Sequence, residues 1–272
     1  MGLFDKLFNK QGKQNNISES KTEKQTPAMP KYENLDGFQV YTPTANIPAV
    51  SPVSTVLKPI SYDEVESLIS SNPLSAVYRR ETQQQTFSMH TLSSDDFFEK
   101  SKGSFIALDL ETTGLDDSVD KIVEIGAVKV KNHSIIDKYQ QLVFPNIHIP
   151  ESASAVNHIT DNMLTDQPFI FQVLPDRLAF VDHHIIVAHN AAFDIKFLAQ
   201  ACLLYRFKMP RQWFDSMDLK PYYPETKSRS LKSLLSAACI ENSDSHRALS
   251  DSESLARLVI ATYDRIQKLE KK

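Results

Sequence analysis

The stretch Ser104–Leu115 reads SFIALDLETTGL, and its apolar run from Phe105 to Leu110 has the length of a strand buried on both faces. Asp109 and Glu111 stand two positions apart in this run and at its end, so their side chains face the same side. Two like charges at the edge of a core repel each other and lose hydration. A divalent cation with oxygen ligands would compensate both costs. The plainer alternative is a strand end whose acids reach solvent.

The composition is that of a polar globular protein of 272 residues with a formal net charge of −4. This charge argues against tight non-specific binding to duplex nucleic acid, although an enzyme can still hold a strand end through metal ions. Cys202 and Cys239 lie in apolar stretches without ligand spacing, which predicts two reduced core thiols and a cytoplasmic protein. The apolar part of the N-terminus is too short for a signal peptide or a membrane span.

Three segments follow from the pattern along the chain. Residues 1–60 are polar and spaced with prolines, which predicts a flexible tail or linker. Residues 61–102 hold two short helical patterns, which predict a helical extension packed on the main domain or on a partner. Residues 103–268 carry longer apolar segments and form the predicted catalytic domain.

The catalytic domain is expected to contain a mixed sheet with helices on both faces. Three strands joined by short links, at 104–110, 121–130 and 134–145, predict an antiparallel meander. Helices and strands then alternate, which makes the fold α/β. The expected helices cover 151–158, 168–181, 191–205, 231–238 and 247–269, and the expected strands cover 183–190 and 211–217.

Two acids lie on the inner faces of predicted helices. Asp251 stands four residues before Leu255, which begins an apolar stripe that continues through Leu258, Thr262, Ile266 and Leu269. Asp194 stands four residues before Leu198 in the same way. A buried carboxylate needs a charge partner, a metal, or backbone amides that satisfy it. Together with the strand pair, the two helical acids favour a shared pair of cations.

Two divalent ions bridged by carboxylates suit the in-line attack of water on a phosphodiester. His246, five residues before Asp251 and ahead of its helix, is the candidate general base, since histidine serves this role near neutral pH. The other histidines, among them His183, His184 and His189, are expected to be core or surface residues.

The segments ALDLETTGL, VAHNAAFDIKF and HRALSD resemble, in order and spacing, the three motifs of the DEDDh (DnaQ-like) 3′–5′ exonuclease family. The chain is most similar to the proofreading epsilon subunit of bacterial DNA polymerase III, from about Gly103 to Tyr263. The resemblance implies a ribonuclease H-like fold, two Mg²⁺ or Mn²⁺ ions, and 3′-to-5′ removal of nucleotides from single-stranded DNA ends. It also implies the site residues: Asp109, Glu111, Asp194 and Asp251 as metal ligands and His246 as the base.

The same resemblance implies a substrate-binding turn at Thr112, Thr113, Gly114 and Leu115, with Leu115 as a wedge between bases. Asn190 and Phe193 match residues that line the nucleotide pocket. Their plainer roles are a helix N-cap for Asn190 and a core position for Phe193.

Two departures from the family are Asn157, where many relatives carry histidine, and Cys239, where glycine is common. Neither is expected to touch a predicted ligand.

Two other functions remain open. An RNA-trimming exonuclease, like ribonuclease T or oligoribonuclease, would keep the chemistry and change the substrate. A non-catalytic binding module associated with a DNA polymerase or a repair complex would keep only the fold. The intact constellation of four acids and one histidine favours the enzyme.

Overall fold

Six strands form one mixed sheet in the computed structural model, which describes residues 60–79, 90–210, 212–242 and 246–270. All of these residues belong to one unit, Ser54–Lys272. The strand order is β1-β6-β5-β2-β3-β4. The strands are β1 (His90–Thr91), β2 (Phe105–Thr112), β3 (Ile122–Lys131), β4 (Ser134–Leu142), β5 (Ile186–Ala188) and β6 (Gln212–Asp215).

Strands β2, β3 and β4 pair antiparallel, as the sequence predicts, whereas β5 pairs parallel to β2, and β6 and β1 continue the parallel side. In the β2–β3 register, Asp109 stands opposite Gly126 and Glu111 stands opposite Glu124. The strand that carries the first two acids is therefore central in the sheet, between an antiparallel and a parallel neighbour.

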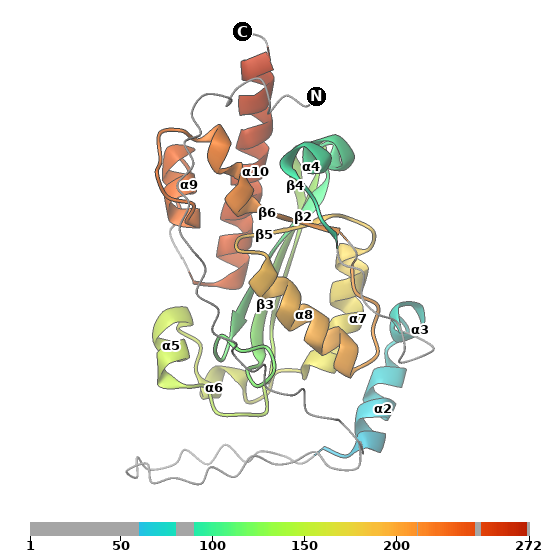
Figure 1. Ribbon diagram of the computed structural model, residues 1–272. Helices are drawn as coiled ribbons and strands as arrows, with labels where there is room; N and C mark the ends of the chain where they lie inside the picture. Colours follow the sequence, from blue (N-terminus) through green and yellow to red (C-terminus); the bar gives the residue numbers. More distant parts are fainter. Residues whose placement is uncertain (1–59, 80–89, 211, 243–245, 271–272) are drawn as a thin grey trace, which may run out of the picture. The chain divides into compact units, whose positions relative to one another are not determined.

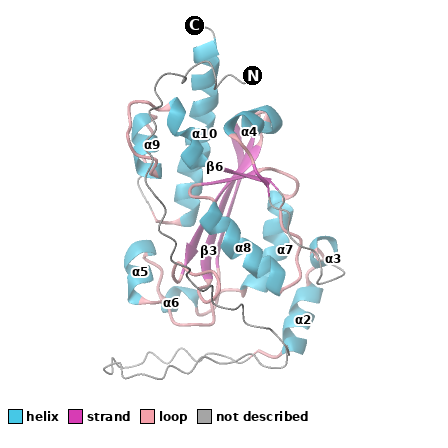
Figure 2. Ribbon diagram, in the orientation of Figure 1, coloured by secondary structure: helices cyan, strands magenta, loops and turns pink. Residues whose placement is uncertain are grey.

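Helices cover both faces of this sheet (Figures 1 and 2), which confirms the predicted ribonuclease H-like architecture. The helices are α2 (Tyr62–Ser71), α3 (Ser75–Tyr78), α4 (Ser94–Ser101), α5 (Glu151–Asn157), α6 (Asp161–Leu164), α7 (Ile170–Val181), α8 (Ala192–Leu204), the 3₁₀-helix η1 (Ser216–Tyr222), α9 (Leu231–Ala237) and α10 (Ala248–Glu270).

The two faces of β2 belong to different cores. Ile106, Leu108 and Leu110 pack with residues of α7 and α8, whereas Phe105 and Ala107 pack with residues of α9 and α10. Because side chains alternate along a strand, Asp109 and Glu111 continue the row of Phe105 and Ala107. They therefore lie on the face that α10 covers.

Residues 61–102 form three short helices, of which α2 and α4 bury apolar side chains in the cores of this domain. Val65 and Ile69 of α2 join the core formed with α7 and α8. Phe97 of α4 is buried in the other core, where its ring stacks on Phe214 with the centroids 4.4 Å apart. The predicted tail at 1–60 lies outside the described residues except for Ile60.

Several boundaries and exposures differ from the sequence-based expectation. The strand expected at 183–190 is confined to β5, and the strand expected at 211–217 passes into η1 after Asp215. Leu269 is 54% exposed rather than part of a buried stripe, because the last turn of α10 extends beyond the sheet (Figure 1).

The prediction of two core thiols is wrong for one cysteine. Cys202 is buried, but Cys239 is exposed. The φ angle of Cys239 is 57°, in the left-handed region that glycine adopts most easily, which explains why a glycine would suit this position. Within the described part of the chain, no helix combines the length and apolar character needed to cross a membrane.

Candidate active site

Three of the predicted metal ligands meet at one point. Asp109, Glu111 and Asp251 each offer a carboxylate oxygen within 4.8 Å of those of the other two. Asp109 and Glu111 come from adjacent same-side positions of β2, and Asp251 comes from the first turn of α10. The three carboxylates therefore meet as the sequence predicts. Asp109 and Glu111 face one side of β2 because side chains alternate along a strand, and Asp251 lies on the inner face of α10, four residues before Leu255.

The fourth acid, Asp194, is not a member of this group of three, but it lies close enough for its charge to act on Asp109. It is 3% exposed in the first turn of α8, which directly follows the loop after β5. Its Oδ1 accepts a hydrogen bond from the backbone N–H of Leu110 at 3.0 Å. This bond fixes the Asp194 carboxylate against the strand that carries Asp109.

Asp109, Glu111 and Asp194 are held in an environment that disfavours their charge. Burial, followed by the charges of Asp194, Glu111 and Asp251, raises the pKa of Asp109 well above its usual value. Burial, followed by the charges of Asp251 and Glu124, raises the pKa of Glu111 to about 7. Burial also raises the pKa of Asp194.

Such a site is electrostatically incomplete by itself. Clustered oxygen donors that repel one another are the ligand set that hard divalent cations such as Mg²⁺ and Mn²⁺ prefer. The residues present therefore fit a divalent metal centre, with Asp109, Glu111 and Asp251 as the central donors and Asp194 beside them.

His246 lies at the edge of this group. Its backbone N–H donates a hydrogen bond to Asp251 Oδ2 at 2.9 Å, and Asn242 donates to the other oxygen of the same carboxylate. His246 has a left-handed φ angle of 66° and is exposed. The structure thus brings His246 next to a metal-ligand candidate, and its role as the base stays a prediction.

The predicted substrate turn is a braced loop with one projecting side chain. Thr113 Oγ1 donates to Asp120 Oδ1 at 3.0 Å, and the backbone N–H of Asp116 donates to Asp120 Oδ2 at 3.0 Å. A Cβ at Gly114 would lie only 2.4 Å from Asp120 Oδ2, so any other residue there would displace the carboxylate that braces the loop. Leu115 is 86% exposed, whereas Thr112 and Thr113 are buried.

Asn190 does not cap α8, so that expectation is wrong. The N-cap position is Ala191, and Asn190 takes a left-handed φ of 55°. The backbone N–H groups of Asn190 and Ala191 instead donate to the two carboxylate oxygens of Asp215, each at 3.1 Å. Phe193 packs partly buried against the core and contacts Phe197, with the ring centroids 4.9 Å apart.

Sequence reasoning missed three residues that shape this site. Asp215, at the end of β6, orients the start of the helix that carries Asp194. Asn157 is buried, its Nδ2 donates to the carbonyl oxygen of Thr112 at 3.3 Å, and its side chain offsets part of the rise in the pKa of the adjacent Glu111, so it acts on a predicted ligand, which the sequence does not lead us to expect. Glu124 is 0% exposed on the strand next to β2. An acid in the middle of an apolar strand is the signal that could have revealed Glu124.

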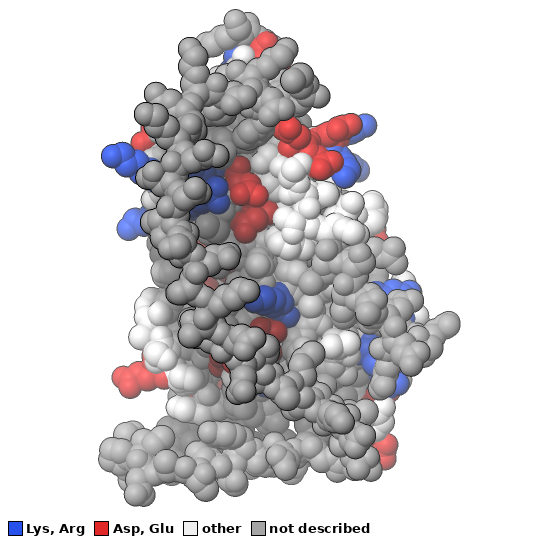
Figure 3. Space-filling model, in the orientation of Figure 1, with Lys and Arg blue, Asp and Glu red and all other residues white. Residues whose placement is uncertain are grey.

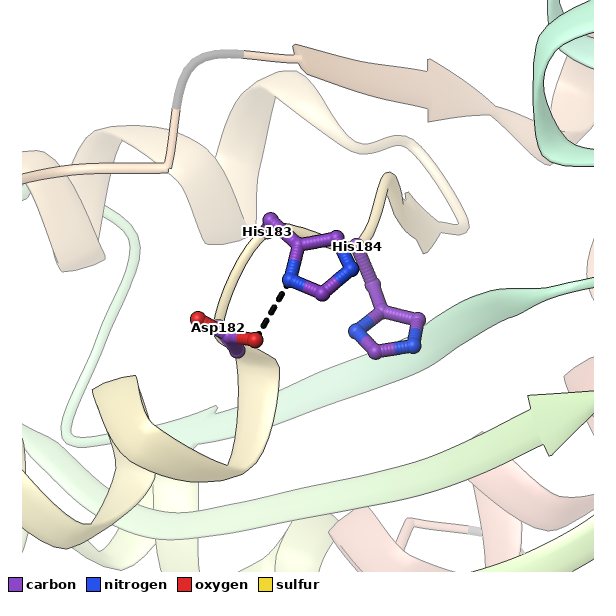
Figure 4. Close-up of side chains that lie close together, drawn as sticks. All are labelled: Asp182, His183 and His184. Atoms are coloured by element: carbon purple, nitrogen blue, oxygen red, sulfur yellow. Dashed lines mark hydrogen bonds and ion pairs between the residues drawn. The ribbon is translucent and has the colours of Figure 1, made fainter.

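A second group of possible metal ligands lies on the turn between α7 and β5 (Figure 4). It consists of Asp182, His183 and His184, which are consecutive in the sequence. Asp182 bonds to Nδ1 of His183, and Nδ1 of His184 donates to the carbonyl oxygen of Val181 at 3.0 Å. His183 is exposed and His184 half-buried, in keeping with the expected surface role.

On the face drawn in Figure 3, acidic and basic side chains are interspersed among the described residues. This distribution agrees with the modest net charge of −4.

The predicted site residues lie within the part of the chain that matches a protein-family model. An exonuclease model, RNase_T, matches residues 106–259, which include all four acids and His246. The DNA polymerase III PolC-type of Thermotoga petrophila is 36% identical over 185 residues, covering 66% of this chain and 13% of that protein. The 3′-5′ exonuclease DinG of Staphylococcus aureus is 34% identical over 171 residues, covering 61% of this chain and 19% of that protein. The chain therefore spans less than a fifth of the length of these relatives.

Two solved structures share the fold. The nuclease domain of 3′hExo, a DEDDh family member bound to rAMP, superposes with a TM-score of 0.53 at 19% identity and covers 60% of this chain and 92% of that domain. Exonuclease I of E. coli in complex with a dT13 oligonucleotide superposes with a TM-score of 0.54 at 18% identity and covers 62% of this chain and 43% of that protein. At these identities the likeness concerns the fold.

Proposed function

Because this chain belongs to the exonuclease family, as a DnaQ-like 3′–5′ exonuclease, we propose that it removes nucleotides one at a time from the 3′ ends of single-stranded DNA. The observation that carries the proposal is the meeting of Asp109, Glu111 and Asp251 at one point, with Asp194 buried beside them. A cluster of acids that raises its own pKa values is costly for a protein with no cation to bind there.

The four carboxylates would hold two divalent ions, Mg²⁺ or Mn²⁺. When bound, such ions activate the attacking water and stabilise the leaving oxygen of a phosphodiester. His246 would accept the proton from the attacking water, because it adjoins Asp251 and faces solvent from which that water enters. The Thr112–Leu115 turn would hold the terminal nucleotide, with the exposed Leu115 side chain against a base.

DNA is the proposed substrate because the relatives with 34–36% identity include PolC-type DNA polymerases. Those proteins are polymerases by name, so we extend the proposal to a role beside a DNA polymerase in replication or repair. Adding the chain to an exonuclease-deficient polymerase on a mismatched primer should then increase removal of the mismatched nucleotide. An unchanged rate of mismatch removal would contradict the polymerase role and leave the nuclease proposal standing.

The test of the reaction is a nuclease assay on 5′-labelled single-stranded DNA, duplex DNA and RNA of matched sequence, with Mg²⁺ or Mn²⁺ and with EDTA. We expect a ladder of shortened single-stranded DNA, release of nucleoside 5′-monophosphates, and no reaction in EDTA. Faster shortening of RNA than of DNA would assign the chain to RNA trimming.

The Asp109→Asn variant should lose this activity, because one of the central carboxylates becomes a neutral amide. Asp137→Asn is the matched control, since Asp137 is an exposed acid on β4. Equal activity in the two variants would refute the role of Asp109 as a metal ligand. No hydrolysis of any substrate by the unmodified chain would support a non-catalytic binding module instead.

A further inference from the structure

Glu124 of β3 is a buried carboxylate to which the proposed function gives no part. We propose that Glu124 is a positioning residue of the nuclease site, which holds the first turn of α10, and with it Asp251, in place against Asp109 and Glu111. The kinetic part of this inference rests on the proposed function, whereas its metal-binding part does not.

Both oxygens of the Glu124 carboxylate are occupied by contacts to α10 and β4. Oε1 accepts from Arg247 Nη2 at 2.9 Å and from Gln140 Nε2 at 2.7 Å. Oε2 accepts from Arg247 Nε at 3.2 Å and from the backbone N–H of Ala248 at 3.0 Å. Ala248 is the first residue of α10, so Glu124 binds the helix through its first free N–H group and through the side chain just before it.

These contacts give Glu124 a different role from that of the metal-ligand candidates. Glu111 stands directly opposite Glu124 in the β2–β3 register and lies close enough to feel its charge. Burial opposes the charge of Glu124, but the hydrogen bonds from Arg247, Gln140 and Ala248 outweigh it and lower its pKa. Glu111 offers a carboxylate oxygen to the group of three acids, whereas both oxygens of Glu124 already accept hydrogen bonds from Arg247, Gln140 and Ala248. Of the two facing glutamates, Glu111 is therefore the ligand and Glu124 the anchor.

Gly126, the next residue of β3 on the same side as Glu124, is also in close contact with α10. A Cβ at Gly126 would lie 2.1 Å from the backbone carbon of Ala248, so α10 touches the strand directly at this point. Ser252 Oγ donates to the carbonyl oxygen of Gly126 at 2.9 Å. Gly126 stands opposite Asp109, and Ser252 follows Asp251. Glu124 and Gly126, which stand opposite Glu111 and Asp109 in the sheet, therefore also fix the position of α10 and its Asp251.

The test compares Glu124→Gln with the matched control Glu253→Gln, in the full chain. Glu253 is also on α10, but it pairs at the surface with Lys138 and Arg257. Melting temperature is measured in EDTA and across a Mn²⁺ titration, and kcat and KM are measured on single-stranded DNA at saturating Mn²⁺. A ligand that binds the folded state raises the melting temperature, so the Mn²⁺-dependent rise reports the integrity of the site without catalysis.

For Glu124→Gln we expect about 10–100-fold more Mn²⁺ to be needed for half-saturation, as is typical when a group that orients metal ligands is removed. We expect kcat to fall while KM for DNA changes little. Glu253→Gln should match the unmodified chain in its Mn²⁺ response. An equal loss of melting temperature in EDTA and in Mn²⁺, with unchanged half-saturation, would overturn the positioning role. If the chain binds Mn²⁺ but hydrolyses nothing, the nuclease proposal is refuted, and a higher Mn²⁺ requirement of Glu124→Gln in the melting assay would still support the positioning role.

Removing one partner of a buried ion pair can prevent folding. The double variant Glu124→Gln/Arg247→Met removes the charge of the buried Glu124 together with that of its half-buried partner, so neither charge is left unpaired. We expect it to melt in EDTA closer to the unmodified chain than Glu124→Gln does, and still to require more Mn²⁺ for half-saturation. A normal Mn²⁺ response of the double variant would overturn the inference.

Discussion

Replacing Glu111 by glutamine should stabilise the metal-free protein at alkaline pH and destroy its response to divalent ions. Burial, with the charges of Asp251 and Glu124, raises the pKa of Glu111 from 4.5 to about 7 in the folded state. Below pH 4.5 the carboxyl is protonated in both the folded and the unfolded chain, so the substitution changes little there. Between pH 4.5 and 7 only the unfolded chain ionises, and the stability of the folded state falls as the pH rises.

The size of this effect follows from the pKa. A rise from 4.5 to about 7 corresponds to roughly 3 kcal/mol of lost stability above pH 7, at about 1.4 kcal/mol per pKa unit. Partial exposure screens some of the repulsion, and the glutamine must also be desolvated, so a gain of about 2 kcal/mol is the realistic expectation. At roughly 2–4 °C per kcal/mol, this gain raises the melting temperature at pH 8 by about 4–8 °C.

Circular dichroism melts in EDTA at pH 5 and pH 8 would measure this gain. Adding Mn²⁺ at pH 8 should reverse the order of stability, because the unmodified chain gains about 2.7 kcal/mol at a hundredfold excess over Kd and the variant lacks a ligand. Glu253→Gln is the control, because the pKa of Glu253 is shifted in the direction opposite to that of Glu111. Arg257 and Lys138 hold the pKa of Glu253 below its usual value, so this variant should gain nothing at pH 8. A Glu111→Gln variant that is less stable than the unmodified chain in EDTA at pH 8 would refute the reasoning.

Four further outcomes are expected. His246→Ala should lower kcat about 10²–10⁴-fold with Mn²⁺ affinity nearly unchanged, and a loss of Mn²⁺ binding would show that His246 is a ligand rather than the base. Leu115→Ala should leave the melting temperature unchanged and weaken binding of a single-stranded oligonucleotide by about 1 kcal/mol, measured by fluorescence anisotropy, because the exposed side chain can contact only a ligand. Asp215→Ala should cost about 0.5–2 kcal/mol in urea denaturation, as the N–H groups before α8 lose their acceptor, and an unchanged midpoint would contradict that role. Deleting residues 1–59 should leave kcat unchanged, because the predicted site residues lie between Asp109 and Asp251, and a large loss of activity would assign this segment a part in catalysis.

The acids of the site could be predicted because local periodicity determines which way they point. Asp109 and Glu111 follow the two-residue alternation of β2, and Asp251 follows the four-residue step back from Leu255. The same rule predicts the burial of Asp194. It fails at Leu269, since periodicity says which face of a helix is apolar but not where the covering layer ends.

The supporting residues could not be predicted because their roles depend on contacts between distant segments. Asp215 serves the start of α8 only because β6 lies parallel to β5. Asn157 reaches Thr112 across 45 positions of sequence, and Glu124 reaches Arg247 across 123. Contacts between residues so far apart along the chain produce no periodic pattern in the sequence. Only the burial of polar residues within apolar surroundings could have drawn attention to them.

The way the four acids are tolerated without a cation also follows from the fold. Asp194 and Asp251 both lie in the first turn of a helix, where the free N–H groups and the helix dipole favour negative charge. Each also accepts a backbone N–H from outside its helical turn, from Leu110 and from His246. Asp109 and Glu111 lie on a strand, which offers no such dipole. Burial nevertheless raises the pKa of Asp194 as well as those of Asp109 and Glu111, so all three carboxylates are left for a bound cation to neutralise. The pKa of Glu253 is lowered instead, and this is why substitution of Glu111, rather than of Glu253, is expected to stabilise the metal-free chain.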